Sequence, residues 1–316
     1  MRITSLGHTE CLIECPLANA DVYRILLDSW LSDYCVADCM ERSPRVTIDW
    51  ALFPRIDLIY ISHSHLDHLD PYFLHELYEH QSPTLLIAET LAYLVPTLTA
   101  ALPVGTRIEI LRHMETRVFA QEIELTGIVY SGEVITNEED VMTLFVSQGD
   151  VCMYFEVDTV PPLIASEQAL LQSLYTARSY TRRLYIASAN ELEGNIAILD
   201  LMSTEGRVDF EASYEARRRD EIHERTEVIL EEDLPLARIW TLPGFEVAYI
   251  GQGLQFPSSI SRALAGTKVM SLEQICALET ETAREYGIIC PRRVLGAGES
   301  ISLSDRPSGS IAGLTF

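Results

Sequence analysis

The sequence predicts a single layered α/β domain, and two patterns indicate this fold class. In the first hundred residues, short apolar runs typical of strands are followed by segments with helical spacing. From about residue 105 to 160, four further strand-like runs follow one another with only turns between them, as in antiparallel hairpins. Because no repeat or linker divides the chain, we expect residues 1–316 to form one domain.

The expected elements follow in order. A helix is predicted where Asp70 offers a favourable N-cap and Pro71 fits the first helical position. A strand and a helix are predicted next, in "SPTLLIAE" and "ETLAYLVPTL". The first strands are expected in "RITSLGHTECLIECP", "VYRILLDSWL" and "DLIYIS", and the hairpins in "TRIEILRH", "TRVFAQEIELTGIVY", "VMTLFVSQG" and "DVCMYFEVD".

Residues 164–232 are expected to form a helical insertion that covers the substrate. Leucines and a tyrosine there have the i, i+1, i+4, i+5 spacing of one buried helix face: Leu170, Leu171, Leu174 and Tyr175. Its aromatic residues would either line an apolar pocket or pack within the insertion: Tyr175, Tyr180, Tyr185, Phe210 and Tyr214. Strands and a helix are expected again in "FEVAYIGQGL", "SLEQICALETETAREYG" and "RRVLGAGESISLS".

Composition narrows the classes of partner. Hydrophobic residues make up 47% of the chain, which is enough for a sizeable core. The net charge of −24 repels phosphate backbones and anionic membranes, so neither nucleic acid nor a membrane is an expected partner. No run approaches the ~20 apolar residues of a membrane span, and "MRITSLGHTE" lacks the apolar run of a signal peptide. Seven scattered cysteines fit a reducing compartment, and we expect a cytoplasmic protein.

The segment "LIYISHSHLDHLDPYFL" carries the strongest sign of chemistry. In an extended segment, His63 and His65 face the same way, Asp67 follows two positions later, and His68 points elsewhere. These four side chains can therefore divide between two neighbouring metal positions. A polar loop with hydrogen-bonded histidines is the alternative, but the cluster follows an apolar strand and opens a capped helix, which favours a metal site.

His63-x-His65-x-Asp67-His68 resembles the signature of the metallo-β-lactamase fold superfamily. "ITSLGHTECLIE", "ILLDSWLS" with Asp28 and "RRVLGAGESISL" resemble segments of its UlaG-like and N-acyl-phosphatidylethanolamine phospholipase-like branch. "MYFEVDTV" resembles the strand that ends in the metal-bridging aspartate, here Asp158. The resemblance implies an αββα sandwich with two metals at one edge of its sheets.

The resemblance also implies a ligand set, from which this chain departs at two places. The family's histidine before the bridging aspartate is absent; Glu133 is the best remaining donor, with Tyr130 a weaker one. No histidine follows His223, which lies in a highly charged segment, so the last ligand stays unassigned. One metal is expected on His63, His65, Glu133 and Asp158, and the other on Asp67, His68 and Asp158, with Asp67 and His68 as catalytic candidates.

A carboxylate-rich set of this kind resembles the non-haem diiron oxygenases of this fold in natural-product biosynthesis. Two segments also resemble CMP-N-acetylneuraminate hydroxylase, although the Rieske ligands of that family are absent. The resemblance implies two iron ions, O₂ as co-substrate, a small or medium organic substrate and a reductase as electron donor. The alternative is a zinc or manganese hydrolase of an ester, lactone, amide or phosphodiester. A third reading, a binding protein that has lost activity, is disfavoured by the intact histidine cluster.

Overall fold

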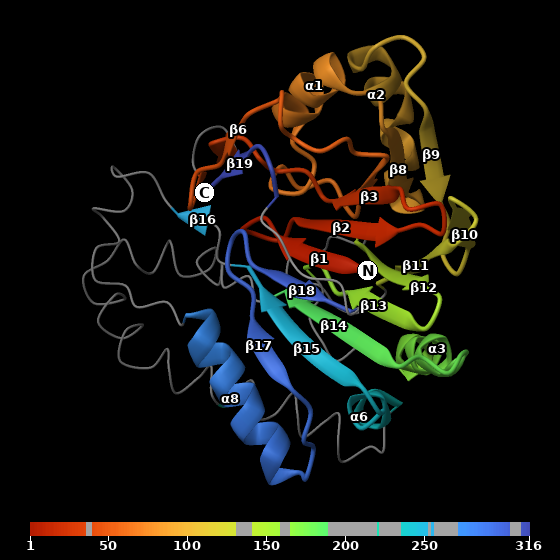
Figure 1. Ribbon diagram of the computed structural model, residues 1–316, viewed down its shortest axis with the longest axis vertical. Helices are drawn as coiled ribbons and strands as arrows, with labels where there is room; N and C mark the ends of the chain where they lie inside the picture. Colours follow the sequence, from red (N-terminus) through yellow and green to blue (C-terminus); the bar gives the residue numbers. More distant parts are fainter. Residues whose placement is uncertain are drawn as a thin grey trace.

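The computed structural model describes residues 1–35, 40–130, 141–158, 165–188, 220, 235–251, 254–255, 271–303 and 311–316. Two seven-stranded sheets lie face to face between two groups of helices, which gives four layers (Figure 1). The sequence predicts this layered α/β class, and the structure confirms it. No helix among these residues is both long enough and apolar enough to cross a membrane.

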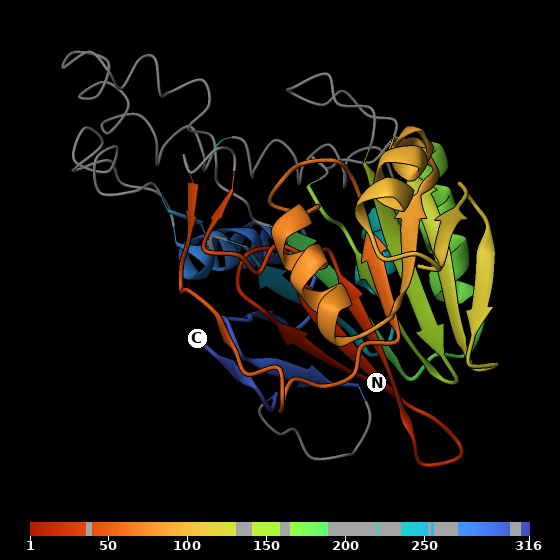
Figure 2. The same cartoon turned by 90° about the horizontal axis from the view of Figure 1, so that it is seen from above.

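The first sheet is antiparallel at one side and parallel at the other. Its order is β18 (Ser300–Ser302), β1 (Arg2–Ser5), β2 (Cys11–Pro16), β3 (Val22–Leu27), β7 (Leu58–Ile61), β8 (Thr84–Ala88) and β9 (Ile108–Leu111). The strands from β3 to β9 run parallel. Strand β1 pairs with β18, so strands from opposite ends of the sequence lie side by side in this sheet (Figure 1, and from above in Figure 2).

The second sheet begins with antiparallel hairpins in three of the four runs expected to form them. The fourth run, "TRIEILRH", is β9, which pairs in parallel with β8 in the first sheet instead. Its order is β10 (Thr116–Phe119), β11 (Ile123–Val129), β12 (Met142–Gln148), β13 (Val151–Phe155), β14 (Arg182–Ser188), β15 (Phe245–Ile250) and β17 (Arg292–Val294). The strands from β13 to β17 run parallel. Five short strands form two small sheets: β4 (Tyr34–Cys35) and β5 (Met40–Arg42) with β16 (Leu254–Gln255), and β6 (Thr47–Ile48) with β19 (Leu314–Thr315).

The central parallel strands are buried on both faces, as their continuous apolar sequences require. Every residue of β7, β13 and β15 is buried. The outer helices cover the sheets with apolar faces: α1 (Pro71–His80), 3₁₀ helix η1 (Glu89–Leu94) and α2 (Val95–Ala101) on the first sheet, and α3 (Ala165–Thr176), α6 (Pro235–Trp240) and α8 (Leu272–Glu285) on the second (Figure 1).

Helix α1 begins where the sequence predicted. The Asp70 carboxylate accepts hydrogen bonds from the backbone N–H groups of Tyr72 and Phe73, at 2.9 and 3.0 Å, and Pro71 occupies the first turn. This cap fixes the direction in which the chain leaves the histidine cluster. The segment expected as a second helix is divided into η1 and α2, since Pro96 lacks the N–H that would continue the preceding turn.

Part of the segment expected as a helical insertion belongs to the sheet. Residues 165–176 are helical, with Leu171 and Tyr175 fully buried, but Arg182–Ser188 is β14, between β13 and β15. A short apolar run such as "RLYIA" has no periodicity that separates strand from helix, and here parallel pairing decides its state.

The tyrosines of this segment that the structure describes belong to the core. Tyr175, Tyr180 and Tyr185 are buried, and the first two pack their rings on Phe145. Of the two roles expected for these tyrosines, the described contacts are those of packing. Residues 189–219 and 221–234, with Phe210 and Tyr214, lie outside the described residues.

Candidate metal centre

The candidate site lies where parallel strands of both sheets end. Asp28 directly follows β3, the histidine cluster follows β7, and Asp158 follows β13. The two sheets are joined at this edge, because the backbone N–H of Met142 donates to the Ser62 carbonyl at 3.1 Å and the Tyr60 hydroxyl donates to the Met142 carbonyl at 2.7 Å. Loops at the carboxyl ends of parallel strands are common ligand sites in α/β folds.

Asp158 faces two histidines of the cluster. Its Oδ2 lies 2.8 Å from Nε2 of His68 and 3.8 Å from Nε2 of His63. One ligand atom from each of these three residues lies within 4.8 Å of the others, a spacing that one metal ion can span. The Ser188 hydroxyl donates to the other carboxylate oxygen of Asp158 at 3.2 Å. The fold thus brings together two residues that lie 90 positions apart in the sequence.

His65 lies beside His63. Its Nδ1 lies 2.9 Å from Nε2 of His63, and the two ring centroids are 4.5 Å apart. His63 and His68 are fully buried, with ring centroids 4.0 Å apart. The three imidazoles therefore lie together, and two of them, His63 and His68, face Asp158.

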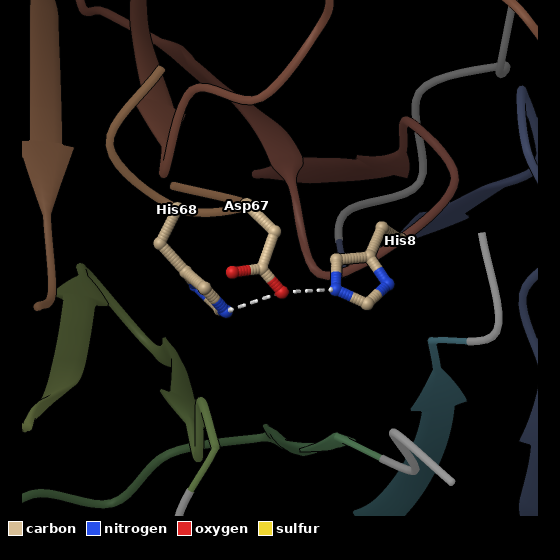
Figure 3. Close-up of side chains that lie close together, drawn as sticks. All are labelled: His8, Asp67 and His68. Atoms are coloured by element: carbon tan, nitrogen blue, oxygen red, sulfur yellow. Dashed lines mark hydrogen bonds and ion pairs between the residues drawn. The ribbon is translucent and has the colours of Figure 1, made fainter. Parts of the chain in front are cut away.

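Asp67 belongs to a second group, with a histidine that the sequence analysis did not select. Its Oδ2 lies 3.0 Å from Nε2 of His8 and 3.9 Å from Nε2 of His68 (Figure 3). These three residues also offer ligand atoms within 4.8 Å of one another. One signal could have revealed His8: it opens the polar run "HTE", which interrupts the apolar strands "RITSL" and "CLIEC".

A buried hydrogen-bond chain sets the orientation of two histidines. Oδ2 of Asp28 lies 2.7 Å from Nδ1 of His68 and accepts the Ser62 hydroxyl at 2.9 Å. The Ser62 oxygen in turn lies 2.9 Å from Nδ1 of His63. Since the Nδ1 atoms of both rings are engaged on this side, their Nε2 atoms face Asp158, and ligation of a metal through Nε2 fits this arrangement.

Comparisons with known proteins identify the architecture. No family model matches the sequence. The structure is similar to CmlA, a diiron β-hydroxylase from Streptomyces venezuelae, with a TM-score of 0.54 at 13% identity, over 96% of this chain and 54% of that one. It is similar to an isothiocyanate hydrolase from Delia radicum gut bacteria, with a TM-score of 0.50 at 11% identity, over 96% and 99% of the two chains. The metallo-β-lactamase fold protein YhfI from Bacillus subtilis matches with a TM-score of 0.48 at 11% identity, over 95% and 99%.

The protein has the metallo-β-lactamase fold. Among curated proteins, a Mycolicibacterium smegmatis protein described as a Rieske 2Fe-2S iron–sulfur protein is 34% identical over 71 residues. That match covers 22% of this chain and 13% of that protein. The chain thus spans about half the length of CmlA (54%) and a small part of the M. smegmatis protein.

Within this metallo-β-lactamase fold, the charges of the site favour a bound cation. Burial works against a charged His68, but the carboxylates of Asp158, Asp28 and Asp67 outweigh it and raise the pKa of His68 well above its ordinary value. Burial also works against the charged carboxylates of Asp158 and Asp67, yet His68 holds the pKa of each far below the usual range. Burial and the neighbouring charge of His68 lower the pKa of His63.

Other sequence candidates lie elsewhere. Tyr130 is buried just after β11, and Glu133 lies outside the described residues, as does His223. Of the remaining histidines, His75 is exposed on α1 and His113 is exposed at an isolated bridge to β11. Neither belongs to the two groups that could hold a metal.

Proposed function

We propose that the protein is a non-haem diiron monooxygenase that hydroxylates a small or medium organic substrate. The observation that carries the proposal is the donor set: three neighbouring imidazoles and the carboxylates of Asp67 and Asp158, all from one edge of the fold. The structural similarity to CmlA, a diiron β-hydroxylase, agrees with it.

The donor set fits iron. Imidazole suits iron, zinc and copper, whereas carboxylate oxygen suits harder ions such as manganese. Two histidines and one carboxylate with open positions are typical of ferrous sites in oxygenases, and His63, His65 and Asp158 supply that combination. Glu133, expected from the sequence, would make the position richer in carboxylate. The second position would take Asp67 and His68, with Asp158 between the two ions.

The bound iron pair would supply the redox chemistry with O₂. The residues of the chain fix the orientation of the ligands before a metal binds. Asp28 and Ser62 fix the orientation of His63 and His68, and the surrounding strands exclude water from those rings. Asp67 and His68 remain the candidate catalytic residues, because they would hold the second ion next to the substrate.

Electrons would come from a separate reductase. A Rieske centre needs two cysteines and two histidines, and the chain lacks that spacing. The local similarity to a protein described as a Rieske iron–sulfur protein agrees with an iron–sulfur protein as the proposed electron donor.

Hydrolysis by zinc or manganese is the second candidate function. The described histidines and Asp158 are also sufficient to activate a water on one zinc ion. The similarity to an isothiocyanate hydrolase favours this candidate, at a lower TM-score than that to CmlA.

A reconstitution experiment distinguishes the monooxygenase from the hydrolase. Metal-free protein is loaded with ferrous iron, zinc or manganese without oxygen, and each form is tested for ester, lactone, amide and phosphodiester hydrolysis. Each form is also tested for O₂ consumption with a chemical reductant and candidate substrates. Substrate-dependent O₂ uptake by the iron form alone supports the monooxygenase; hydrolysis by the zinc form without O₂ uptake refutes it. His75→Ala, on exposed α1, is the matched control for a histidine change.

A further inference from the structure

We propose that His8 is a metal ligand, which completes the second metal position together with Asp67 and His68. This inference rests on the proposed two-metal function and adds a residue to its site. The loop between β1 and β2 would then contribute to the metal centre, in addition to the loops after β7 and β13.

The distances suit three ligands of one ion. Nε2 of His8 lies 3.0 Å from Oδ2 of Asp67, and Nε2 of His68 lies 3.9 Å from the same oxygen. Two donors that are each about 2.1 Å from an ion lie roughly 3 to 4 Å apart. The two rings lie on opposite sides of the Asp67 carboxylate (Figure 3), so small rotations bring all three donors to one ion.

Packing alone does not explain His8. The residue is 1% exposed, its Nε2 meets Asp67, and its Nδ1 has no hydrogen-bond partner in the structure. Buried polar atoms are normally paired, and an unpaired one costs about 1–3 kcal/mol. A leucine or phenylalanine would fill the space beside Trp30 without an unpaired nitrogen, but it would leave the Asp67 carboxylate without this partner. The role of the imidazole therefore lies at Asp67, where its Nε2 is placed as a ligand atom of the same ion would be.

The loop that carries His8 is held rigidly. The guanidinium of Arg42, which is fully buried, donates to the carbonyls of Leu6 and Trp30 and pairs with Glu10 at 3.0 Å. Gly7 has φ +132° and passes so close that a Cβ atom there would lie 2.8 Å from Nη2 of Arg42. A loop fixed on both sides of His8 keeps its imidazole directed at Asp67, as a preorganised ligand requires.

The second position then matches the first in composition. His8, His68 and Asp67 would supply two imidazoles and one carboxylate beside the shared Asp158, and His63 and His65 would supply the two imidazoles of the first position. That combination is typical of ferrous iron in oxygenases. No histidine follows His223 in the sequence, so the second position takes its imidazole from the opposite end of the chain.

The test compares metal binding by the metal-free full-length wild type with that of His8→Gln, His8→Ala and the control His75→Ala. Ferrous iron is titrated without oxygen, and the bound metal is counted after dialysis. A glutamine amide can still donate a hydrogen bond to Asp67, but it is a poor metal ligand. A ligand role therefore predicts two sites in wild type and His75→Ala, with the second site weakened more than about 100-fold in both His8 variants. That loss exceeds the 10–100-fold expected from an outer hydrogen bond.

The inference is overturned if His8→Gln binds two ions with the affinity of the wild type, because His8 would then only orient Asp67. If wild type itself binds fewer than two ions, the two-metal function fails and the inference with it. Pulsed EPR of manganese-loaded wild type gives a reading that does not depend on a variant folding. Two coupled histidine nitrogens at the second manganese position support the ligand role, and a second position with one coupled nitrogen, from His68 alone, overturns it.

Discussion

Oδ2 of Asp28 lies 2.7 Å from Nδ1 of His68 and 2.9 Å from the hydroxyl of Ser62, which itself lies 2.9 Å from Nδ1 of His63. One buried carboxylate oxygen thus orients two imidazoles of the metal centre. Asp28 has φ +54°, a conformation that costs free energy for most residues and that aspartate and asparagine tolerate best. The site therefore depends on a residue that contacts no metal.

Replacing Asp28 by asparagine should weaken metal binding 10–100-fold. Asparagine tolerates the same backbone conformation, but its amide nitrogen cannot accept from Ser62 or His68. The free energy of unfolding of the metal-free protein should fall by about 1–3 kcal/mol. Metal titration and urea denaturation measure the two effects. Asp28→Ala should be less stable than Asp28→Asn, because alanine adds backbone strain at this position. Equal metal affinity in Asp28→Asn and wild type would show that His68 needs no carboxylate partner.

Alanine in place of His65 or Asp158 should remove bound metal and all activity. Asp158 faces both His63 and His68, so its loss affects both metal positions, whereas loss of His65 affects the first. Metal counting on each purified variant provides the measurement, with His75→Ala as the control. Full occupancy in both variants would refute the assignment of these ligands.

Much of this fold could be predicted from the sequence because its signals are local. Asp70 and Pro71 fix the start of α1, and the alternating apolar runs give the hairpins. Strand β14 was missed, since "RLYIA" becomes a strand only through parallel pairing with β13 and β15. His8 was missed for a similar reason: it lies 59 positions from Asp67, and no spacing rule connects them. Glu133 stays a prediction from the sequence.

Changing Glu133 to histidine should shift the metal preference from iron or manganese toward zinc. Imidazole is a softer and neutral donor, and its substitution lowers the negative charge at the first position. Competition between ferrous iron and zinc for the metal-free protein gives the ratio of affinities. An unchanged ratio would show that Glu133 is not a ligand.

Metal affinity should rise with pH. In the metal-free protein the carboxylates of Asp158, Asp28 and Asp67 raise the pKa of His68 despite its burial, so this imidazole keeps its proton above its ordinary value of about 6.5. A metal ion must displace that proton, and binding grows tighter until the pH exceeds the raised pKa. Calorimetry in buffers of different ionisation enthalpy counts the protons released. Release of no proton near neutral pH would contradict a role for His68 as a ligand.

The most direct test of the central claim is the metal content of protein purified without added metal, together with its Mössbauer spectrum after exposure to O₂. For the diiron monooxygenase we expect about two irons per chain and a coupled diferric signal, because a position with two histidines and one carboxylate favours iron. Stoichiometric zinc, or a single redox-silent ion per chain, would contradict the diiron monooxygenase and leave the hydrolase as the better description.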